Sequence, residues 1–319
     1  MIERPYVLGV DVGGTKIAAA VVAPDGAIGS LTQVETPADQ GPGAIVGAAL
    51  DATRTAVARS PYPVVACGIG TAGTVGRGGV ITHATDVLRG WTGTNLKQAF
   101  GDALGIPVVV LNDVHATSIG EGTYGAAAGF TDALVVAIGT GIGGGLLHNG
   151  VLFPGGSGSA GSIGHMPVDA ASPRRCSCGK WNHLEAHAAG PAIEARYAEV
   201  TGLSIRLPEI AARARTGEDP AASVIAEAAA ILGRALGGAV NLLDPDVVVI
   251  SGGVAAIEDL LAEPIRRALA GEVLPGPGRV EVRYTTLGTT AAILGAGMMA
   301  RELYKQQGST TLAPGCGEP

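Results

Sequence analysis

Three glycine turns, each at the end of an apolar run, present groups that could bind a phosphorylated ligand. They are Asp11-Val-Gly-Gly-Thr-Lys16, Gly139-Thr-Gly-Ile-Gly-Gly-Gly145 and Ser251-Gly-Gly253. Adjacent glycines leave backbone N–H groups open to phosphate oxygens, and the hydroxyls of Thr15 and Thr140 add two donors. Each turn alone is a weak signal, but three of them in one chain indicate binding of a nucleotide.

The first turn also carries a carboxylate, because Asp11 could orient a Mg²⁺ ion through water. The turn has neither the Walker A spacing nor a Gly-x-Gly-x-x-Gly motif after a βαβ strand, so neither of those nucleotide-binding folds follows. Taken alone, the segment also fits a tight hairpin with an aspartate at the edge of the core. The bare backbone of Ser251-Gly-Gly253 offers a place for an adenine or a ribose.

A candidate catalytic base follows another apolar run. Residues 107–111 read as a strand, and Asn112 and Asp113 come directly after it. A carboxylate at a strand end can accept the proton of a hydroxyl group as that group attacks a phosphate. Without further context, the same pair of residues also fits an Asx turn after a strand.

One loop contains four potential metal ligands: His165, Cys176, Cys178 and His183. Thiolates and imidazoles satisfy the tetrahedral nitrogen and sulfur preference of Zn²⁺. The spacing is not that of a standard zinc finger. The alternative is a metal-free loop with two buried thiols and two surface histidines.

The elements that must position these groups follow an α/β pattern. Strand patterns cover 6–12, 16–23, 64–70, 107–111, 133–139, 145–148, 246–250 and 279–284, and helical patterns cover 42–59, 94–104, 191–240, 256–271 and 290–306. A strand, a glycine turn, a second strand and an Xaa-Gly turn occur at 6–26 and again at 133–150. This repetition predicts a duplicated α/β unit with two glycine turns that face one cleft, and a coincidence in a glycine-rich chain is the alternative.

Composition excludes several classes of protein. The hydrophobic fraction of 47% excludes disorder over most of the 319 residues. A net charge of −7 and 3% aromatic residues argue against a nucleic-acid partner. The start of the chain does not read as a signal peptide, and no window reads as a membrane span. Isolated cysteines and a close Cys-x-Cys pair fit a reduced, cytoplasmic protein.

The motifs together resemble the ROK family of sugar kinases and regulators, within the actin-like ATPase superfamily. The resemblance runs from Tyr6 to about Lys305. Its carriers are the segments Asp11–Lys16, Gly68–Gly73, Leu111–Asp113, Gly139–Gly144, Ile163–Met166, Cys176–Gly179, Leu184–Glu185 and Ser251–Gly253. It implies an α/β fold with two ribonuclease-H-like domains and an interdomain active-site cleft that closes over a sugar and ATP.

The resemblance also implies limits for the domains. We expect an N-terminal α/β domain of residues 1–112 plus about 290–308. We expect a larger C-terminal α/β domain of residues 113–289, which contains the metal-binding loop 155–190. Residues 309–319 read as a disordered tail.

The family's pattern assigns roles to residues of this chain. Asp113 is the expected catalytic base of an ATP-dependent transfer to the 6-hydroxyl of a hexose or of an amino or N-acetyl hexose. The expected sugar-binding residues are Gly73, Asn112, Asp113, Ser162, His165 and Glu185. The expected ATP and phosphate contacts are Asp11, Gly13, Gly14, Thr15, Lys16, Thr140, Gly141, Gly252 and Gly253. Mg²⁺ accompanies ATP, and a structural Zn²⁺ is held by His165, Cys176, Cys178 and His183.

The chain departs from the family's pattern in the sugar pocket and the metal loop. Ser162 stands where the family has the Glu of Glu-x-Gly-His, while Asn182 and His183 stand where it has Gly and Cys. His115 stands where the family often has Asn. A shorter, neutral residue at 162 leaves space for an amino or N-acetyl substituent. Glucose is the default expectation from the resemblance, and N-acetylmannosamine or another amino sugar is the alternative that this space favours.

Other functions of the family remain as alternatives. A DNA-binding repressor is not expected, because those members carry an N-terminal helix-turn-helix and this chain reaches Asp11 almost at once. A sugar-sensing protein without catalysis is the alternative of another class, and polyphosphate is an alternative phosphoryl donor. The expected partner is a small-molecule sugar, with no nucleic acid and no membrane, and we expect a homodimer or a higher homo-oligomer.

Overall fold

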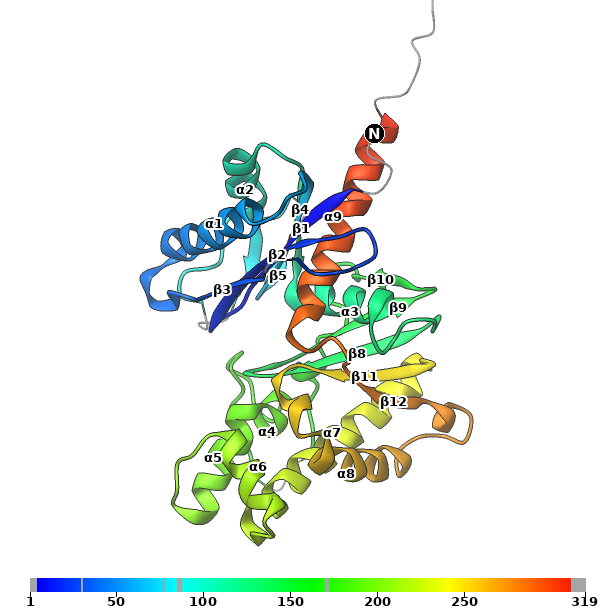
Figure 1. Cartoon of the computed structure of the whole chain (residues 1–319). Coiled ribbons are helices and arrows are strands. Elements are labelled where there is room, and N and C mark those ends of the chain that lie inside the picture. Colours follow the sequence, from blue (N-terminus) through cyan, green and yellow to red (C-terminus); the bar gives the residue numbers. More distant parts are fainter. Residues whose placement is uncertain (1–4, 30, 77, 85–87, 170–171, 311–319) are drawn as a thin grey trace, which may run out of the picture. The chain divides into compact units, whose positions relative to one another are not determined.

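The computed structural model describes residues 5–29, 31–76, 78–84, 88–169 and 172–310, and Figure 1 shows the order of their elements. The chain divides into two compact units, which are Met1–Gly120 with Thr290–Pro319 (unit 1) and Glu121–Thr289 (unit 2). The compact units divide between Gly120 and Glu121, eight residues after the expected domain limit between 112 and 113, which stays a prediction. Of the expected tail, residues 311–319 lie outside the described residues.

Unit 1 is built on a five-stranded sheet of order β3-β2-β1-β4-β7. The first three strands pair antiparallel, whereas β1, β4 and β7 pair parallel. The strands are β1 (Tyr6–Val12), β2 (Lys16–Val22), β3 (Thr32–Glu35), β4 (Val64–Thr71) and β7 (Val108–Asn112), with a separate pair β5 (Thr74–Val75) and β6 (Ile81–His83). The helices are α1 (Pro42–Ala58), α2 (Leu96–Leu104), α9 (Ala291–Thr310) and the start of α3 (Asp113–Tyr124).

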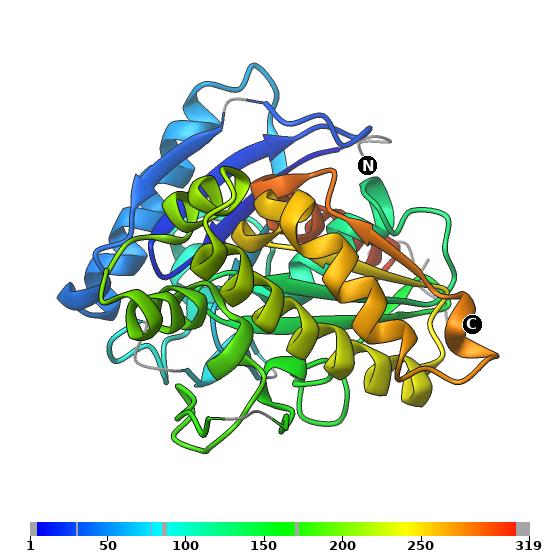
Figure 2. The same ribbon diagram turned by 90° about the horizontal axis from the view of Figure 1, so that it is seen from below.

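Unit 2 repeats this sheet, with the order β10-β9-β8-β11-β12. Its strands are β8 (Ala133–Ile138), β9 (Ile142–His148), β10 (Val151–Phe153), β11 (Val247–Ser251) and β12 (Glu281–Tyr284). Its helices are α4 (Glu185–Ala188), α5 (Gly190–Thr201), α6 (Leu207–Arg215), α7 (Asp219–Leu243) and α8 (Glu258–Ala270). Figure 2 shows α7 and α8 side by side, and the largest buried cluster of the unit lies between the sheet and these helices.

The two sheets have the same strand order and the same pattern of parallel and antiparallel pairs. The turn between β1 and β2 therefore corresponds to the turn between β8 and β9, and both turns are glycine-rich. The predicted duplication of an α/β unit is confirmed. The sequence did not predict α3 or the short strands β3 and β10.

Helix α7 is long and apolar enough to cross a membrane, by length and composition alone. However, 67% of its most apolar window is buried inside the protein. Burial of this kind is typical of a core helix, which covers one face of a sheet. Among the described residues, no other helix meets the same criterion.

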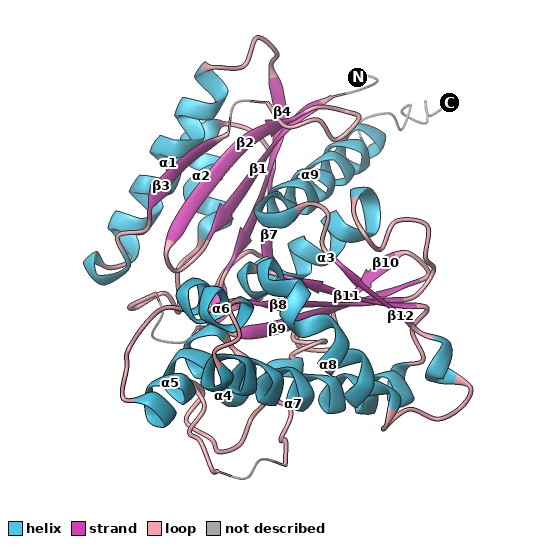
Figure 3. Ribbon diagram, turned by 60° about the horizontal axis from the view of Figure 1, so that its bottom comes forward, coloured by secondary structure: helices cyan, strands magenta, loops and turns pink. Residues whose placement is uncertain are grey.

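Two glycines bring α9 against the sheet of unit 1. Alternate residues of a strand face opposite sides, so Leu8 and Val10 pack in the core with α1 while Gly9 faces α9. Figure 3 shows α1 and α9 on opposite faces of this sheet. A Cβ atom on Gly68 of β4 would lie 1.8 Å from the carbonyl oxygen of Ala296. The helix can approach this closely only because the strand residue has no side chain.

This contact predicts a large effect of Gly68→Ala on stability. The added methyl group must displace α9, and we expect a loss of about 3 kcal/mol or more in the free energy of unfolding. Gly101→Ala in α2 is the matched control, because nothing lies within 4 Å of its Cβ position. That change should stabilise the protein by up to about 1 kcal/mol, since alanine favours a helix. Urea denaturation measures both, and equal effects would contradict the close contact.

Candidate active site

Asn112 joins the end of β7 to the start of α3. Its Oδ1 accepts hydrogen bonds from the backbone N–H groups of Val114 (3.0 Å) and His115 (3.2 Å), which caps the helix. Its Nδ2 donates to Asp113 Oδ1 (2.9 Å) and to the carbonyl oxygen of Gly73 (3.0 Å). The amide is fully used, so Asn112 fixes Asp113 and Gly73 relative to each other. A sugar hydroxyl could bind Asn112 only by replacing one of these partners.

Asp113 is the first residue of α3, where the positive end of the helix dipole favours a carboxylate. Burial raises the pKa of this carboxyl above its ordinary value, and the hydrogen bond from the Val114 N–H (2.9 Å) opposes the shift. The hydrogen bonds from Asn112 and Val114 both fall on Oδ1. Oδ2 is therefore the oxygen that can accept a proton from a ligand.

Asp11, whose charge interacts with that of Asp113, lies on β1 and pairs with Gly70 of β4. Burial raises its pKa to about 7, the negative charge of Asp113 adds to the shift, and Lys16 opposes it. Two nearby carboxylates that resist ionisation together are a favourable place for a cation such as Mg²⁺. The residues present thus fit the expected metal of a phosphate-transfer site.

The glycine turn that follows β1 is held by its own backbone. The N–H of Gly13 donates to the carbonyl oxygen of Lys16 (3.1 Å), and the Thr36 hydroxyl donates to the carbonyl oxygen of Gly13 (2.7 Å). Thr15 and Lys16 are exposed at the tip of the turn, beside Gly14. Their hydroxyl and ammonium groups are free to meet an anionic ligand in solution.

The corresponding turn of unit 2 lies between β8 and β9. The N–H of Gly139 donates to the carbonyl oxygen of Gly141 (2.8 Å), and Thr140 is exposed between them. The N–H of Ile142 donates to Glu185 Oε2 (3.0 Å). A Cβ atom on Gly141 would lie 2.5 Å from the same oxygen, so a side chain at this position would displace the Glu185 carboxylate.

The third glycine turn, Ser251–Gly253, lies at the same edge of the sheet. Ser251 of β11 pairs parallel with Ala137 of β8, so both strands end together. Gly252 has a φ of +86°, and a Cβ atom there would lie 2.4 Å from the carbonyl oxygen of Ile138. Carboxyl edges of parallel strands are where open α/β sheets bind ligands. Thr140, Gly141, Gly252 and Gly253 are thus gathered at one edge of unit 2.

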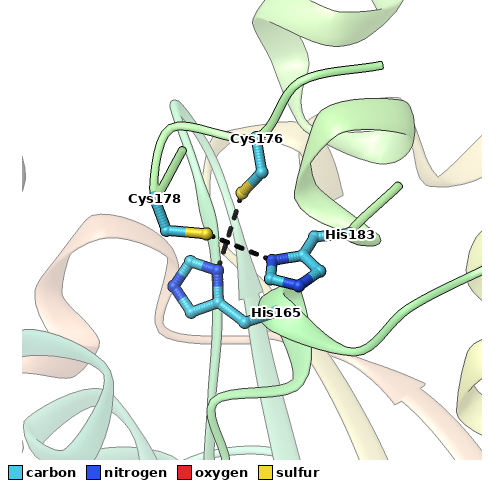
Figure 4. Close-up of side chains that lie close together, drawn as sticks. All are labelled: His165, Cys176, Cys178 and His183. Atoms are coloured by element: carbon cyan, nitrogen blue, oxygen red, sulfur yellow. Dashed lines mark hydrogen bonds between the residues drawn. The ribbon is translucent and has the colours of Figure 1, made fainter. Parts of the chain in front are cut away.

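The four expected metal ligands form one cluster, in which the sulfur and nitrogen atoms lie within 4.8 Å of one another. Figure 4 shows both imidazole rings and both sulfur atoms pointing toward a common centre. Cys176 Sγ is 3.6 Å from His165 Nδ1, and Cys178 Sγ is 3.2 Å from His183 Nδ1. A tetrahedral Zn²⁺ site with bonds of about 2.0 and 2.3 Å has ligand separations of about 3.3 to 3.8 Å. The donor set fits such an ion.

The backbone of the metal loop explains one departure from the family's pattern. Asn182 has a φ of +55°, a left-handed conformation that asparagine adopts more readily than other residues with a side chain. Its Oδ1 accepts from the N–H of Arg174 (2.9 Å), which secures the loop. Asparagine can therefore replace glycine here without a change of path. The neighbouring His183 forms an isolated bridge with Pro167.

Cys176 is the buried ligand of the cluster. Burial, assisted by the nearby Glu185, raises the pKa of its thiol to about 11. Without a metal this thiol stays protonated at neutral pH, and metal binding would release its proton. Cys178 and His165 are exposed, so solvent reaches the cluster at these two residues.

The sugar-binding residues expected in unit 2 surround the metal loop. The Ser162 hydroxyl donates to the carbonyl oxygen of Ser159 (2.7 Å), and the short helix Ile163–His165 follows it. A Cβ atom on Gly164 would lie 1.9 Å from the carbonyl oxygen of Ile142, so this helix packs directly on β9. Ser162, His165 and Glu185 therefore belong to unit 2, and Gly73, Asn112 and Asp113 belong to unit 1.

Two polar residues with structural consequences are not assigned a role by any sequence motif described above. Ser177 donates to Glu185 Oε1 (2.5 Å). Glu121 is fully buried and accepts hydrogen bonds from the N–H of Ala126 (2.9 Å) and from the Thr285 hydroxyl. The position of Ser177 between two cysteines was the available signal, whereas nothing in the sequence marked Glu121 as buried.

The raised pKa of Asp11 predicts a pH dependence of stability in the absence of ligands. Its carboxyl titrates at about 7 when folded and near its ordinary 3.8 when unfolded, so the folded state binds the proton more tightly. Stability should fall as pH rises from about 4 to 7, and Asp11→Asn should remove part of this fall, on the order of 2 kcal/mol. Denaturation at pH 4.5 to about 8 measures it.

Asp102→Asn is the control for this experiment, because Asp102 is an exposed aspartate of α2. It should leave the pH profile of the wild-type protein unchanged. A profile of Asp11→Asn that coincides with the wild-type profile would contradict the assigned shift.

Comparison with known proteins agrees with this geometry. The ROK family model matches residues 7–303. Glucokinase of Halalkalibacterium halodurans is 32% identical over 95% of this chain and 96% of its own length. N-acetylmannosamine kinase of Shigella boydii is 32% identical over 92% of this chain and 98% of its own length. The ROK glucokinase of Streptomyces griseus, solved with glucose and AMPPNP, superposes with a TM-score of 0.82 at 33% identity, covering 93% of this chain and 99% of that chain.

These relatives confirm the predicted fold class, an α/β protein with two ribonuclease-H-like domains of the actin-like ATPase type. They also confirm the predicted enzyme class. The position of the active site in a cleft between the domains stays a prediction. The chain therefore belongs to the ROK family, and it is a sugar kinase.

Proposed function

We propose that this sugar kinase transfers the γ-phosphate of ATP to the 6-hydroxyl of a hexose, with glucose as the first expectation. The observation that carries this proposal is the arrangement of Asn112 and Asp113. Asn112 caps α3 and holds Oδ1 of Asp113, which leaves Oδ2 as the acceptor for a proton. The raised pKa of Asp113 makes it a stronger base than an exposed aspartate.

In the reaction, Asp113 Oδ2 accepts the proton of the sugar hydroxyl as the hydroxyl oxygen attacks the γ-phosphorus. The bond between that phosphorus and the ADP oxygen breaks, and ADP leaves with the electron pair. Phosphoryl transfer depends mainly on positioning and on neutralisation of charge. The glycine turns after β1 and β8, with Thr15, Lys16 and Thr140, would hold the phosphates, and Asp11 would hold Mg²⁺ through water. ATP is the donor we favour because a similar structure binds AMPPNP.

The preferred sugar is open to a second candidate. Ser162 is exposed and shorter than the glutamate of the family's pattern, and its hydroxyl is directed to the carbonyl oxygen of Ser159. Compared with a pocket that has glutamate at this position, a pocket with serine has more space and one negative charge less. This favours an amino or N-acetyl hexose such as N-acetylmannosamine, and kinases of that sugar are as similar to this chain as glucokinases are. Activity in the cytoplasm and assembly into a homodimer or larger oligomer remain predictions.

We further propose that the cluster of His165, Cys176, Cys178 and His183 binds a structural Zn²⁺. The convergence of two imidazole nitrogens and two sulfurs supports this assignment. The ion would supply no chemistry to the transfer. It would brace the loop that presents His165 and Glu185.

Asp113→Ala should abolish phosphoryl transfer while the protein stays folded. Loss of a general base at the attacking hydroxyl reduces turnover by about 10² to 10⁴-fold. An ADP-release assay with Mg-ATP would compare glucose, mannose, glucosamine, N-acetylglucosamine, N-acetylmannosamine and 3-amino-3-deoxyglucose. Asp102→Ala, at an exposed position of α2, should retain the wild-type rate.

Turnover by Asp113→Ala above about one percent of the wild-type rate would contradict the role of Asp113, since a base contributes at least a hundredfold. No turnover of any sugar by folded wild-type protein that binds ATP would favour the sensor without catalysis. The sugar with the highest kcat/KM decides between glucose and an amino sugar.

His183→Ala should lower metal content and thermal stability together. The wild-type protein should carry one zinc per chain by elemental analysis, and a chelator should lower its Tm by about 5 °C or more, because metal binding stabilises only the folded state. His83→Ala, at an exposed position of β6, is the control and should keep both. Folded wild-type protein without zinc would remove the metal assignment.

A further inference from the structure

A single carboxylate connects the metal loop to the glycine turn of unit 2. Glu185, the first residue of α4, uses one oxygen on each side. Oε1 accepts a hydrogen bond from the Ser177 hydroxyl (2.5 Å), and Oε2 accepts one from the N–H of Ile142 (3.0 Å). Because the two contacts lie at opposite oxygens, the orientation of the carboxylate is determined by both partners at once.

Both ends of this connection are tightly packed. On one side, Gly141 lies directly against the carboxylate, since a Cβ atom there would lie 2.5 Å from Glu185 Oε2. On the other side, the N–H of Leu184 donates to the carbonyl oxygen of Met166 (2.9 Å), and the Leu184 side chain is fully buried. The backbone at Glu185 is thus fixed, and only rotation of its side chain could break the connection.

Ser177 is the closer of two donors that face Glu185 Oε1. The Cys176 thiol lies 3.6 Å from this oxygen, whereas the Ser177 hydroxyl lies 2.5 Å from it. Ser177 also stands between Cys176 and Cys178, which are both candidate metal ligands, so a bound ion would hold the backbone on both sides of Ser177.

We propose that Ser177 is a positioning residue, through which the occupied metal loop holds Glu185 and the glycine turn Gly139–Gly145 in place for sugar and phosphate binding. This inference rests on the proposed function, in which Glu185 contacts the sugar and the turn contacts a phosphate. In this proposal, a bound metal ion has a specific structural role. The ion fixes Ser177, Ser177 orients the carboxylate, and the carboxylate fixes the N–H of Ile142.

Ser177→Ala tests this connection without touching a metal ligand. Hydrogen exchange of the Ile142 amide, measured by NMR, should become about tenfold faster, the size expected for loss of one hydrogen bond to a carboxylate. The KM for the sugar should rise by about tenfold, while kcat changes less, because a ground-state contact is weakened. Metal content should stay that of the wild-type protein.

Two controls separate the hydroxyl from other effects. Ser172→Ala, at an exposed serine of the same loop, should leave exchange and KM unchanged. Ser177→Thr keeps a hydroxyl and should restore slow exchange at Ile142. Removal of the metal by a chelator should accelerate exchange at Ile142 as much as Ser177→Ala does. Emission from the exposed Trp181 would report whether the loop has opened, since Trp91, the other tryptophan, is buried in unit 1.

Unchanged exchange at Ile142 in Ser177→Ala would overturn the proposal, whatever the activity. Faster exchange that Ser177→Thr fails to restore would overturn it as well, because the hydroxyl would then not be the cause. If the wild-type protein phosphorylates no sugar, the proposed function fails, but exchange at Ile142 still decides whether Ser177 positions the turn.

Discussion

Close approach between backbone and neighbouring atoms, possible only where the side chain is a hydrogen, determines where the groups of the candidate site lie. Gly68 admits α9 to the sheet of unit 1, Gly252 seats the third glycine turn on the end of β8, and Gly141 admits the carboxylate of Glu185. At each place a Cβ atom would lie 2.5 Å or less from another atom. The same bare backbone that permits packing also leaves N–H groups that a phosphate can reach. Close packing and the proposed binding of phosphate therefore both depend on the absence of a Cβ atom at glycine positions.

Within that frame, hydrogen bonds decide which oxygen of each carboxylate can react. Asn112 holds Oδ1 of Asp113, so Oδ2 remains for a hydroxyl proton. Glu185 has a donor on each oxygen and is therefore oriented rather than reactive. Asp11 has the raised pKa of a buried carboxylate near a second one, which suits a cation site. The three carboxylates thus differ in their surroundings, and their proposed roles differ accordingly.

Most strands of the two sheets were predicted from the sequence, because a run of apolar residues followed by an Xaa-Gly turn is a signal that lies within a few consecutive residues. The sequence did not predict α3, whose segment contains Gly120, Gly122 and several β-branched residues that disfavour a helix. The helix is stabilised by the Asn112 cap and by contact with α9, where a Cβ atom on Gly120 would lie 2.1 Å from the carbonyl oxygen of Ala291. That contact joins residues far apart in the chain. The hydrogen bond between Ser177 and Glu185 was not predicted for another reason, since Ser177 lies in a segment without a regular pattern of apolar residues.

The metal loop illustrates how a sequence can change while its geometry is kept. Asn182 adopts the left-handed conformation for which the family's pattern uses glycine, and His183 presents Nδ1 to the centre of the cluster. The change of ligand would alter the charge of the proposed metal site, because Zn²⁺ with two thiolates and two imidazoles is neutral, whereas a third thiolate would make the site negative. A neutral site would repel the adjacent Glu185 carboxylate less, and this carboxylate accepts hydrogen bonds from both Ser177 and Ile142.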